Sequence, residues 1–319
     1  KIIKIFIIPL TREGSGKTAV LMMTPFVVTA KRVLVVTPSR MVRDQIVEDF
    51  SQLKTLNKAT VVNRNFSKPV VYEMKHLFND EIINSVRRSD VIVATPACAL
   101  SLTENIETKQ LIDMVLIDEA HHVPAKTWEQ IFINMEHAKQ ILFTATPFRM
   151  DKKEIKGDLI YNYPMSLAYK DGIFGEIKYI PIEKAQNKDE LIAQKAETVF
   201  LSDREKGYEH FLMVRTNTRK KGKELEQLYK DKTSLKLKRI DSSMGNTTIK
   251  KFTKDLKSKK LDGIICVDML GEGFDFPNLK IAAIHAPHKS LASTLQFIGR
   301  FARTNADNIG VAKFIAMND

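Results

Sequence analysis

The chain has 319 residues, enough for about two domains at the usual ~150 residues each. Hydrophobic residues make up 44% and charged residues 28% of it, a composition that excludes a disordered chain. Lys and Arg number 50 against 38 Asp and Glu, so the net charge of +12 favours a polyanionic partner, usually nucleic acid or an anionic surface.

The two cysteines, Cys98 and Cys266, stand far apart and in no metal-ligand spacing. They exclude a disulfide framework and a cysteine-type zinc site, and they favour a reducing compartment, the cytoplasm. The longest apolar runs, residues 5–10 and 33–36 among them, fall far short of the ~20 residues that cross a bilayer. The first ten residues lack a small-residue cleavage site, so they predict a strand rather than a signal peptide. We therefore expect no membrane partner.

Short, continuous apolar runs alternate with amphipathic helical patterns along the whole chain. Such runs are typical of strands buried on both faces of a parallel sheet. They lie at residues 5–8, 33–36, 91–94, 115–117, 141–143, 211–214, 264–267, 281–284 and 311–315. After the second run, Ser39 is suited to cap a helix whose single apolar face carries Val42, Ile46 and Phe50. Strands alternating with helices predict an α/β fold with doubly wound parallel sheets.

The stretch 150–181 is rich in Pro and Gly and shows no long helical period, which is typical of a domain boundary. We expect a first domain at 1–165, a linker at 166–180 and a second domain at 181–319. Between Arg219 and Lys260 there are fifteen Lys or Arg against five Asp or Glu. This segment indicates one basic face on the second domain, or else a set of solvated lysine-rich helices.

A phosphate-binding loop is predicted directly after the first strand, formed by Gly14, Ser15, Gly16, Lys17 and Thr18. Small residues let the backbone bend around a phosphate, and the helix N-terminus that follows faces the anion. Lys17 would reach the β- and γ-phosphates, and the Thr18 hydroxyl would bind Mg²⁺. Thr11 stands where the full pattern has a small residue, and Glu13 places a carboxylate near the phosphates. We expect Glu13 to point away, or residues to be missing within Pro9–Glu13.

Two adjacent carboxylates, Asp118 and Glu119, end the apolar run that starts at Met114. Doubly wound sheets bind their ligands at the carboxyl ends of their strands, and this run is expected to be a central strand. Asp118 is suited to hold Mg²⁺, and Glu119 to accept a proton from an attacking water. A solvated acidic turn is the alternative for this pair taken alone.

Together, the phosphate loop and Asp118-Glu119-Ala120-His121 resemble the superfamily-two helicases and translocases of the DEAH type. Other motifs of that family have similar stretches in the same order, at Val35–Arg40, Ile92–Pro96, Thr144–Pro147, Asp268–Asp275 and Gln296–Arg303. The tandem His121-His122, Pro147–Arg149 and Gly271–Leu279 resemble the motor branch of restriction enzymes, which includes helicases of bacterial anti-phage systems. The resemblance implies two tandem RecA-like domains.

Further site residues follow from this resemblance. It implies nucleic-acid contacts at Thr37, Arg40, Thr95 and Pro96, whose hydroxyls and backbone amides suit a phosphodiester backbone without reading its sequence. It also implies nucleotide contacts at Gly273 and Asp275, the latter with the ribose. The residues expected to couple the ATP site to nucleic acid are His121, Thr144 and Thr146.

Gln296, Arg300 and Arg303 are spaced i, i+4 and i+7, so they share one helix face. Two arginines on one face suit a polyphosphate whose charge grows in the transition state. They belong to the second domain, whereas Lys17 and Glu119 belong to the first. We therefore expect ATP to bind in the cleft between the domains, with Arg303 favoured as the arginine finger and Arg300 also on phosphate.

The sequence thus predicts an ATP-hydrolysing helicase or translocase that uses ATP and Mg²⁺ and acts on nucleic acid, with DNA favoured over RNA. An accessory or nuclease subunit is a possible further partner. Two alternatives stay open: a motor ATPase that acts on protein, and a nucleic-acid-binding module whose ATP site is impaired.

Overall fold

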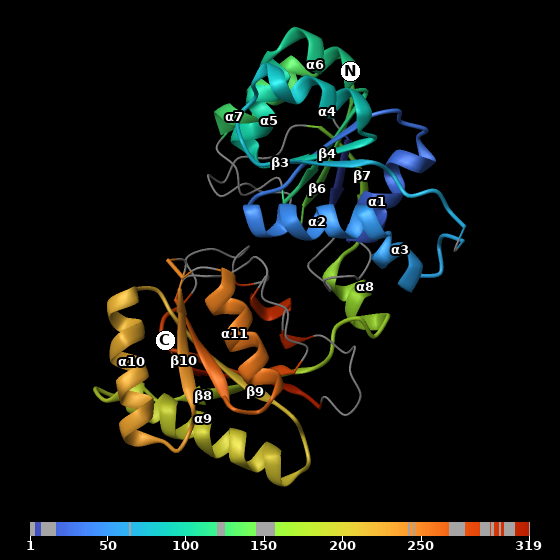
Figure 1. Ribbon diagram of the computed structural model, residues 1–319. Coiled ribbons are helices and arrows are strands. Elements are labelled where there is room, and N and C mark those ends of the chain that lie inside the picture. Colours follow the sequence, from blue (N-terminus) through green and yellow to red (C-terminus); the bar gives the residue numbers. More distant parts are fainter. Residues whose placement is uncertain are drawn as a thin grey trace. The chain divides into compact units, whose positions relative to one another are not determined.

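The structure is a computed structural model that describes residues 4–7, 17–63, 65–119, 125–144, 157–241, 243–244, 246–267, 278–287, 294, 297–299, 301–302 and 310–318. The chain divides into two compact units, Lys1–Pro164 and Met165–Asp319 (Figure 1). Each unit is an α/β structure built on one parallel sheet. The described residues include no helix long and apolar enough to cross a membrane.

The first unit is built on a seven-stranded sheet in which every strand pair is parallel. In spatial order the strands are β3 (Val71–Met74), β4 (Val91–Ala94), β2 (Val33–Val36), β5 (Met114–Asp118), β6 (Lys139–Thr144), β1 (Lys4–Ile7) and β7 (Asp158–Asn162). Its described helices are α1 (Lys17–Val27), α2 (Arg40–Gln52), α3 (Lys54–Lys58), η1 (Asp80–Ile82), α4 (Ile83–Arg88), α5 (Pro96–Glu104), α6 (Ile106–Leu111) and α7 (Ala125–Asn134).

Both faces of this sheet are covered, as the continuous apolar runs predicted. In β2, Leu34 and Val36 pack in one cluster with residues of α5 and α7, whereas Val33 and Val35 pack in another with α1 and α2 (Figure 1). This alternation follows from the period of two along a strand. The cap expected at Ser39 is confirmed, because its side chain accepts a hydrogen bond from the Val42 amide at 3.4 Å.

The second unit has a six-stranded sheet, again parallel throughout. Its strands, in spatial order, are β10 (Leu237–Asp241), β11 (Gly263–Val267), β9 (Phe211–Thr216), β12 (Leu279–Ile284), β13 (Ala312–Met317) and β8 (Ile177–Ile182). Its described helices are α8 (Met165–Lys170), α9 (Lys188–Glu205), α10 (Arg219–Lys232) and α11 (Asn246–Lys257). Helices α9 and α10 bury one face of the sheet. At Gly222 an added Cβ would lie 2.6 Å from Val267 Cγ2, so α10 approaches the sheet closely because of this glycine.

The nine predicted strands are all present, and two parallel-sheet α/β units confirm the predicted fold class. Four further strands, β3, β7, β8 and β10, were not predicted. Each of the four lies at an edge of one of the two sheets. An edge strand can keep one face or both in contact with water, so no continuous apolar run is required. The stretch 166–180, expected as a linker, instead contributes α8 and the start of β8 to the second unit.

Candidate active site

The candidate site lies at the carboxyl edge of the first sheet, where three parallel strands end next to one another. Strand β6 pairs with β5 on one side and with β1 on the other. Phe143 is level with Asp118 in β5 and with Phe6 in β1, so these strands reach the edge together. Helix α1, which follows β1 in the chain, begins at Lys17. The parallel register therefore brings Lys17 and Asp118 together, although they are far apart in the sequence.

Lys17 is held between the two predicted carboxylates. Its Nζ lies 2.8 Å from Oδ1 of Asp118 and also contacts Oε1 of Glu119. The three side chains are largely removed from water, with exposed fractions of 14% for Lys17, 8% for Asp118 and 11% for Glu119. The structure thus brings these three predicted site residues together, and Asp118 and Glu119 do not form a solvated acidic turn.

The electrostatics of this cluster favour a charged lysine. Burial alone lowers the pKa of Lys17, but the charges and hydrogen bonds of Asp118 and Glu119 outweigh it and raise that pKa above its usual value. Burial also raises the pKa of Asp118, an effect that Lys17 opposes and the like charge of Glu119 reinforces. One ammonium group thus faces two carboxyl groups at the edge of the sheet, an excess of acidic groups that suits a cation.

Glu119 has a strained backbone. Its φ of +51° lies in the left-handed region, which a residue with a side chain adopts rarely. Such a conformation costs of order 1–3 kcal/mol and is concentrated at functional sites. Here the chain turns immediately after β5, and the turn directs the carboxylate of Glu119 toward Lys17.

The donor set fits Mg²⁺ bound together with a nucleotide. Oδ1 of Asp118 is buried and has no hydrogen bond within the described part of the chain beyond its ion pair with Lys17. Thr18 adds a half-buried hydroxyl one residue after Lys17. Mg²⁺ prefers hard oxygen ligands, and it commonly takes only one or two from protein and the rest from phosphate and water. Among the described residues no group of three His, Cys, Asp or Glu is placed to hold a metal alone.

The residues expected to contact nucleic acid lie at the ends of two neighbouring strands, β2 and β4, of the same sheet. Arg40 is exposed at the first turn of α2, and Thr95 and Pro96 are half-buried at the start of α5. Thr37 is fully buried, and its hydroxyl donates to the carbonyls of Ser39 (3.3 Å) and Ala94 (3.5 Å). Thr37 thus holds the turn between strand and helix, while the other three are open to a ligand.

Thr144 ends β6 and is fully buried between β1 and β5. This position is beside β5, the strand that ends in Asp118, and the coupling role of Thr144 stays a prediction. The remaining predicted site residues lie outside the described residues and stay predictions: Gly14, Ser15, Gly16, His121, Thr146, Gly273, Asp275, Gln296, Arg300 and Arg303.

A buried polar network in the second unit was not predicted from the sequence. Nδ1 of His285 lies 2.7 Å from Asp189 and its Nε2 lies 3.1 Å from the Tyr229 hydroxyl, while Lys221 pairs with Asp189 at 2.7 Å. Burial lowers the pKa of His285, which favours the neutral ring, and the Nδ1–H donates to the Asp189 carboxylate. The hydrogen bond from His285 holds the pKa of Asp189 well below its usual range. The network ties the end of β12 to α9 and α10, and the wide separation of its members in the chain left no sequence signal.

Two family models match the chain, one for each unit. Residues 6–149 match the type III restriction enzyme res subunit, and residues 193–305 match the helicase conserved C-terminal domain. A putative helicase of a Sulfolobus islandicus filamentous virus is 24% identical over 236 residues, which cover 63% of this chain and 42% of that protein. UvrABC system protein B of Xylella fastidiosa is 27% identical over 172 residues, covering 52% of this chain and 24% of that protein. The chain therefore spans less than half the length of these relatives.

Solved structures share the fold at low identity. A type ISP restriction-modification enzyme, LlaBIII, bound to DNA has a TM-score of 0.67 and 18% identity, covering 100% of this chain and 26% of that one. Dbp5 of S. cerevisiae bound to RNA has a TM-score of 0.61 and 16% identity, covering 99% of this chain and 79% of that one. The fold is that of tandem RecA-like helicase domains.

A parallel α/β fold in two units, a lysine held by two strand-end carboxylates, and the two matching family models define the class: the chain is a superfamily-two helicase protein. Within that class it is related to the motor subunits of restriction enzymes.

Proposed function

We propose that this chain is an ATP-dependent motor that moves on nucleic acid, with DNA favoured over RNA. The observation that carries the proposal is the cluster of Lys17, Asp118 and Glu119 at the carboxyl edge of the first sheet. Nucleic acid as the track is supported by the matching family models and by the net charge of +12. The restriction-enzyme relationship is what favours DNA.

The cluster suggests how the residues act on ATP. A triphosphate gives Lys17 an alternative anionic partner, so Lys17 would leave the carboxylates and bind the phosphates. Asp118 and Thr18 would then hold Mg²⁺, which neutralises charge on the phosphates. Freed from its lysine, Glu119 would orient the attacking water and accept its proton.

The second unit would complete the site. Arg300 and Arg303, with Gln296 on the same helix face, would stabilise the charge that develops on the transferred phosphoryl group. A finger of this kind is worth about 10³–10⁵ in rate in related chemistry. Gly273 and Asp275 would contact the nucleotide, and closing the units on ATP would change the grip of Arg40, Thr95 and Pro96 on the phosphodiester backbone. His121, Thr144 and Thr146 would carry that coupling.

The chain would work in the cytoplasm as part of a larger restriction or anti-phage assembly. Its two cysteines, Cys98 and Cys266, are buried, and so small a number of cysteines is expected in a reducing compartment. The relatives extend beyond the matched region, which leaves room for a nuclease or accessory subunit.

The proposal is tested by ATP hydrolysis measured with single-stranded DNA, duplex DNA and RNA in parallel. We expect nucleic acid to stimulate turnover, and Glu119→Gln to reduce it by about 10²–10⁴ while ATP still binds. Lys17→Ala should lose both turnover and ATP binding. The matched control is Glu129→Gln, since Glu129 is exposed on α7 outside the cluster.

Each alternative has its own signature in this assay. Robust hydrolysis that neither DNA nor RNA changes would favour a motor that acts on protein. Nucleic-acid binding without hydrolysis would favour a binding module with an impaired ATP site. Full turnover in Glu119→Gln would refute the role given to the cluster.

A further inference from the structure

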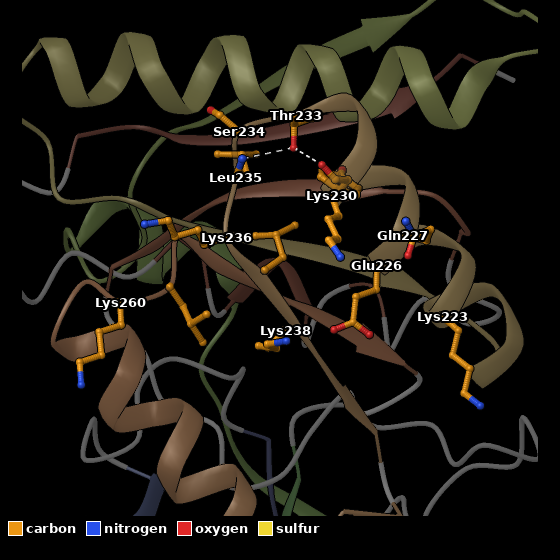
Figure 2. A pocket seen from close by; sticks show the side chains of 13 residues that line it. Lys223, Glu226, Gln227, Lys230, Thr233, Ser234, Leu235, Lys236, Lys238 and Lys260 are labelled. Carbon is orange, nitrogen blue, oxygen red and sulfur yellow. Dashed lines mark hydrogen bonds between the residues drawn. The ribbon is translucent and has the colours of Figure 1, made fainter.

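The second unit contains a lysine-rich cavity of about 610 Å³ outside the predicted motifs. Its walls are α10 from Lys223 onward, the turn 233–236, the start of β10 and the residues that precede β11 (Figure 2). Five of its lining residues are lysines and one is an acid, Glu226. We define the basic pocket by these lysines, namely Lys223, Lys230, Lys236, Lys238 and Lys260.

The lysines of the basic pocket are exposed and form no ion pair with the described residues. Other lysines of the same helix behave differently. Lys221 and Lys232 pair with Asp189 (2.7 Å) and Glu190 (3.0 Å) of α9. Helix α10 therefore pairs its lysines with acids on the side that faces α9, whereas on the side that faces the pocket Glu226 is the one acid that lines it beside five lysines. A net positive charge concentrated in one concave place attracts a polyanion from solution.

The backbone beneath these lysines is held in place by several hydrogen bonds. Thr233 Oγ1 donates to the Tyr229 carbonyl (2.6 Å) and accepts from the Leu235 amide (3.3 Å), as the dashed lines of Figure 2 show. The Ser234 hydroxyl donates to Glu197 at 2.7 Å, and the Lys236 amide donates to Asp262 at 2.8 Å. A turn fixed in this way presents its lysines without a large loss of backbone entropy on binding.

The spacing of the lysines suits an extended chain of phosphates. Lys223 and Lys230 are seven residues apart on α10, which puts them on one side of the helix about 10 Å apart. Lys236 directly precedes β10 and Lys238 lies in it, so along the extended chain these two residues are about 7 Å apart. Figure 2 shows Lys260 and Lys223 at opposite sides of the group. A span of about 10 Å corresponds to three nucleotides of a strand at 3.4 Å each.

The pocket lies at the amino ends of β10 and β11, since its lining includes Leu237 at the start of β10 and Leu261 just before β11. The predicted nucleotide contacts of this unit, Gly273 and Asp275, lie outside the described residues, and neither is among the residues that line the pocket.

We propose that the basic pocket is a second nucleic-acid contact, which holds the phosphodiester backbone of the substrate in addition to the predicted contacts Arg40, Thr95 and Pro96 of the first unit. Its lining apolar side chains, Leu235, Leu237 and Leu261, are buried, so it offers no apolar anchor for a protein partner. Tyr229 is also buried and offers no ring for base stacking. Lysines alone suit a backbone contact that does not read sequence. This inference rests on the proposed function only in taking nucleic acid as the substrate.

The test compares two triple variants of the whole chain that carry the same net charge. One variant combines Lys230→Gln, Lys236→Gln and Lys238→Gln. The control combines Lys184→Gln, Lys195→Gln and Lys206→Gln, three exposed lysines of the second unit that lie outside the pocket. The affinity for a long DNA duplex is measured against salt concentration. Three lost contacts should lower the log–log slope by about 2–3, since each is worth roughly 0.7–0.9, and the control should keep the wild-type slope.

Lysine acetylation read by mass spectrometry gives an independent measure on the unmodified chain. Bound duplex should protect Lys230, Lys236 and Lys238 and leave Lys184 and Lys195 reactive. Equal slopes in the two variants, or no protection of the pocket, would overturn the inference. Unchanged DNA binding with loss of binding to polyglutamate would overturn it in favour of an acidic protein segment.

These outcomes separate the inference from the proposed function. If nucleic acid stimulates hydrolysis but the two variants bind DNA identically, the second contact would be refuted and the proposed motor function would still be supported. If the pocket variant binds DNA more weakly while DNA does not stimulate hydrolysis by the wild type, the second contact would be supported and the proposed motor function would be refuted.

Discussion

The two units of this chain place lysine in opposite surroundings. In the first unit Lys17 is largely buried between two carboxylates, which keep it charged. In the second unit the lysines of the basic pocket are exposed, and none pairs with an acid among the described residues. A charge inside the protein needs an internal counter-charge, because it has lost its water. A charge at the surface stays hydrated, so it needs no counter-charge within the protein and can bind a partner from solution.

The difference bears on how each site selects an anion. A phosphate must compete with Asp118 and Glu119 for Lys17. When Lys17 binds the phosphate, the two carboxylates lose their cation, so a ligand that brings a cation of its own is favoured. A magnesium nucleotide meets that condition. The basic pocket imposes no such competition, so it should accept any extended polyanion, and its binding should weaken strongly with salt.

The largest effect on stability is expected for Lys17→Met. Removal of one partner from a buried ion cluster typically costs about 3–5 kcal/mol, because the remaining charges are left uncompensated. The free energy of unfolding is measured with urea and followed by the fluorescence of Trp128. That residue is the single tryptophan of the chain and is buried in the core of the first unit. The control, Lys31→Met, changes an exposed lysine and should stay within about 0.5 kcal/mol of wild type.

The loss in Lys17→Met should also depend on pH. Without Lys17, the pKa of Asp118 rises further above its unfolded value, because burial and Glu119 are then unopposed. Between those two pKa values the native state binds more protons than the unfolded state, so stability falls as pH rises. The gap between variant and wild type should therefore widen from pH 4 to pH 7. A gap that is constant or narrows over this range would contradict the electrostatic account.

A smaller effect is expected at Lys280, a third kind of lysine. It is buried in β12, and its Nζ donates to the Phe301 carbonyl at 2.7 Å. Burial lowers its pKa to about 8, whereas an unfolded lysine titrates near 10.4. The cost of the buried charge is thus fully present below pH 8. As pH rises from there the native state loses its proton first, and stability increases by at most about 1.4 kcal/mol per pH unit.

Urea unfolding of wild type and Lys280→Met at pH 7.5 and pH 9.5 isolates this effect, since every other lysine titrates in both proteins. Wild type should gain stability relative to the variant at the higher pH. A difference that does not change with pH would show that the native and unfolded states titrate alike at this residue.

The interior strands could be predicted from the sequence, because burial on both faces requires continuous apolar runs. The edge strands could not. Strand β7 has a short apolar run, residues 159–161, but it is exposed along its whole length and lies within the Pro- and Gly-rich stretch that was expected to be a domain boundary. Its place is set by pairing with β1, a contact between segments about 150 residues apart.

The candidate site was predictable for a related reason. Parallel strands end at a common edge, so residues that follow apolar runs, such as Lys17 and Asp118, are brought together by topology. The orientation of a single hydroxyl is not fixed by topology, and Thr37 turns inward to the Ala94 carbonyl of the neighbouring strand. The basic segment was evident from composition. Which of its lysines stay unpaired depends on Asp189 and Glu190 of α9, which are remote in sequence.

The smallest effect on stability separates paired from unpaired lysines of the second unit. The triple variant Lys230→Gln, Lys236→Gln and Lys238→Gln should leave the free energy of unfolding within about 0.5 kcal/mol of wild type. A slight gain is expected at low salt, because repulsion between like charges is relieved. Lys221→Gln removes a pair with Asp189 that is partly open to water and should lose about 0.2–1 kcal/mol.

Thermal unfolding of the two proteins at low and high salt makes this comparison. The advantage of the triple variant should vanish at high salt, where charges more than a Debye length apart no longer interact. A triple variant that loses more stability than Lys221→Gln would mean that the pocket lysines hold the fold together. The pocket lysines would then interact with other groups of the protein rather than with a ligand, and the contrast between the two units would no longer hold.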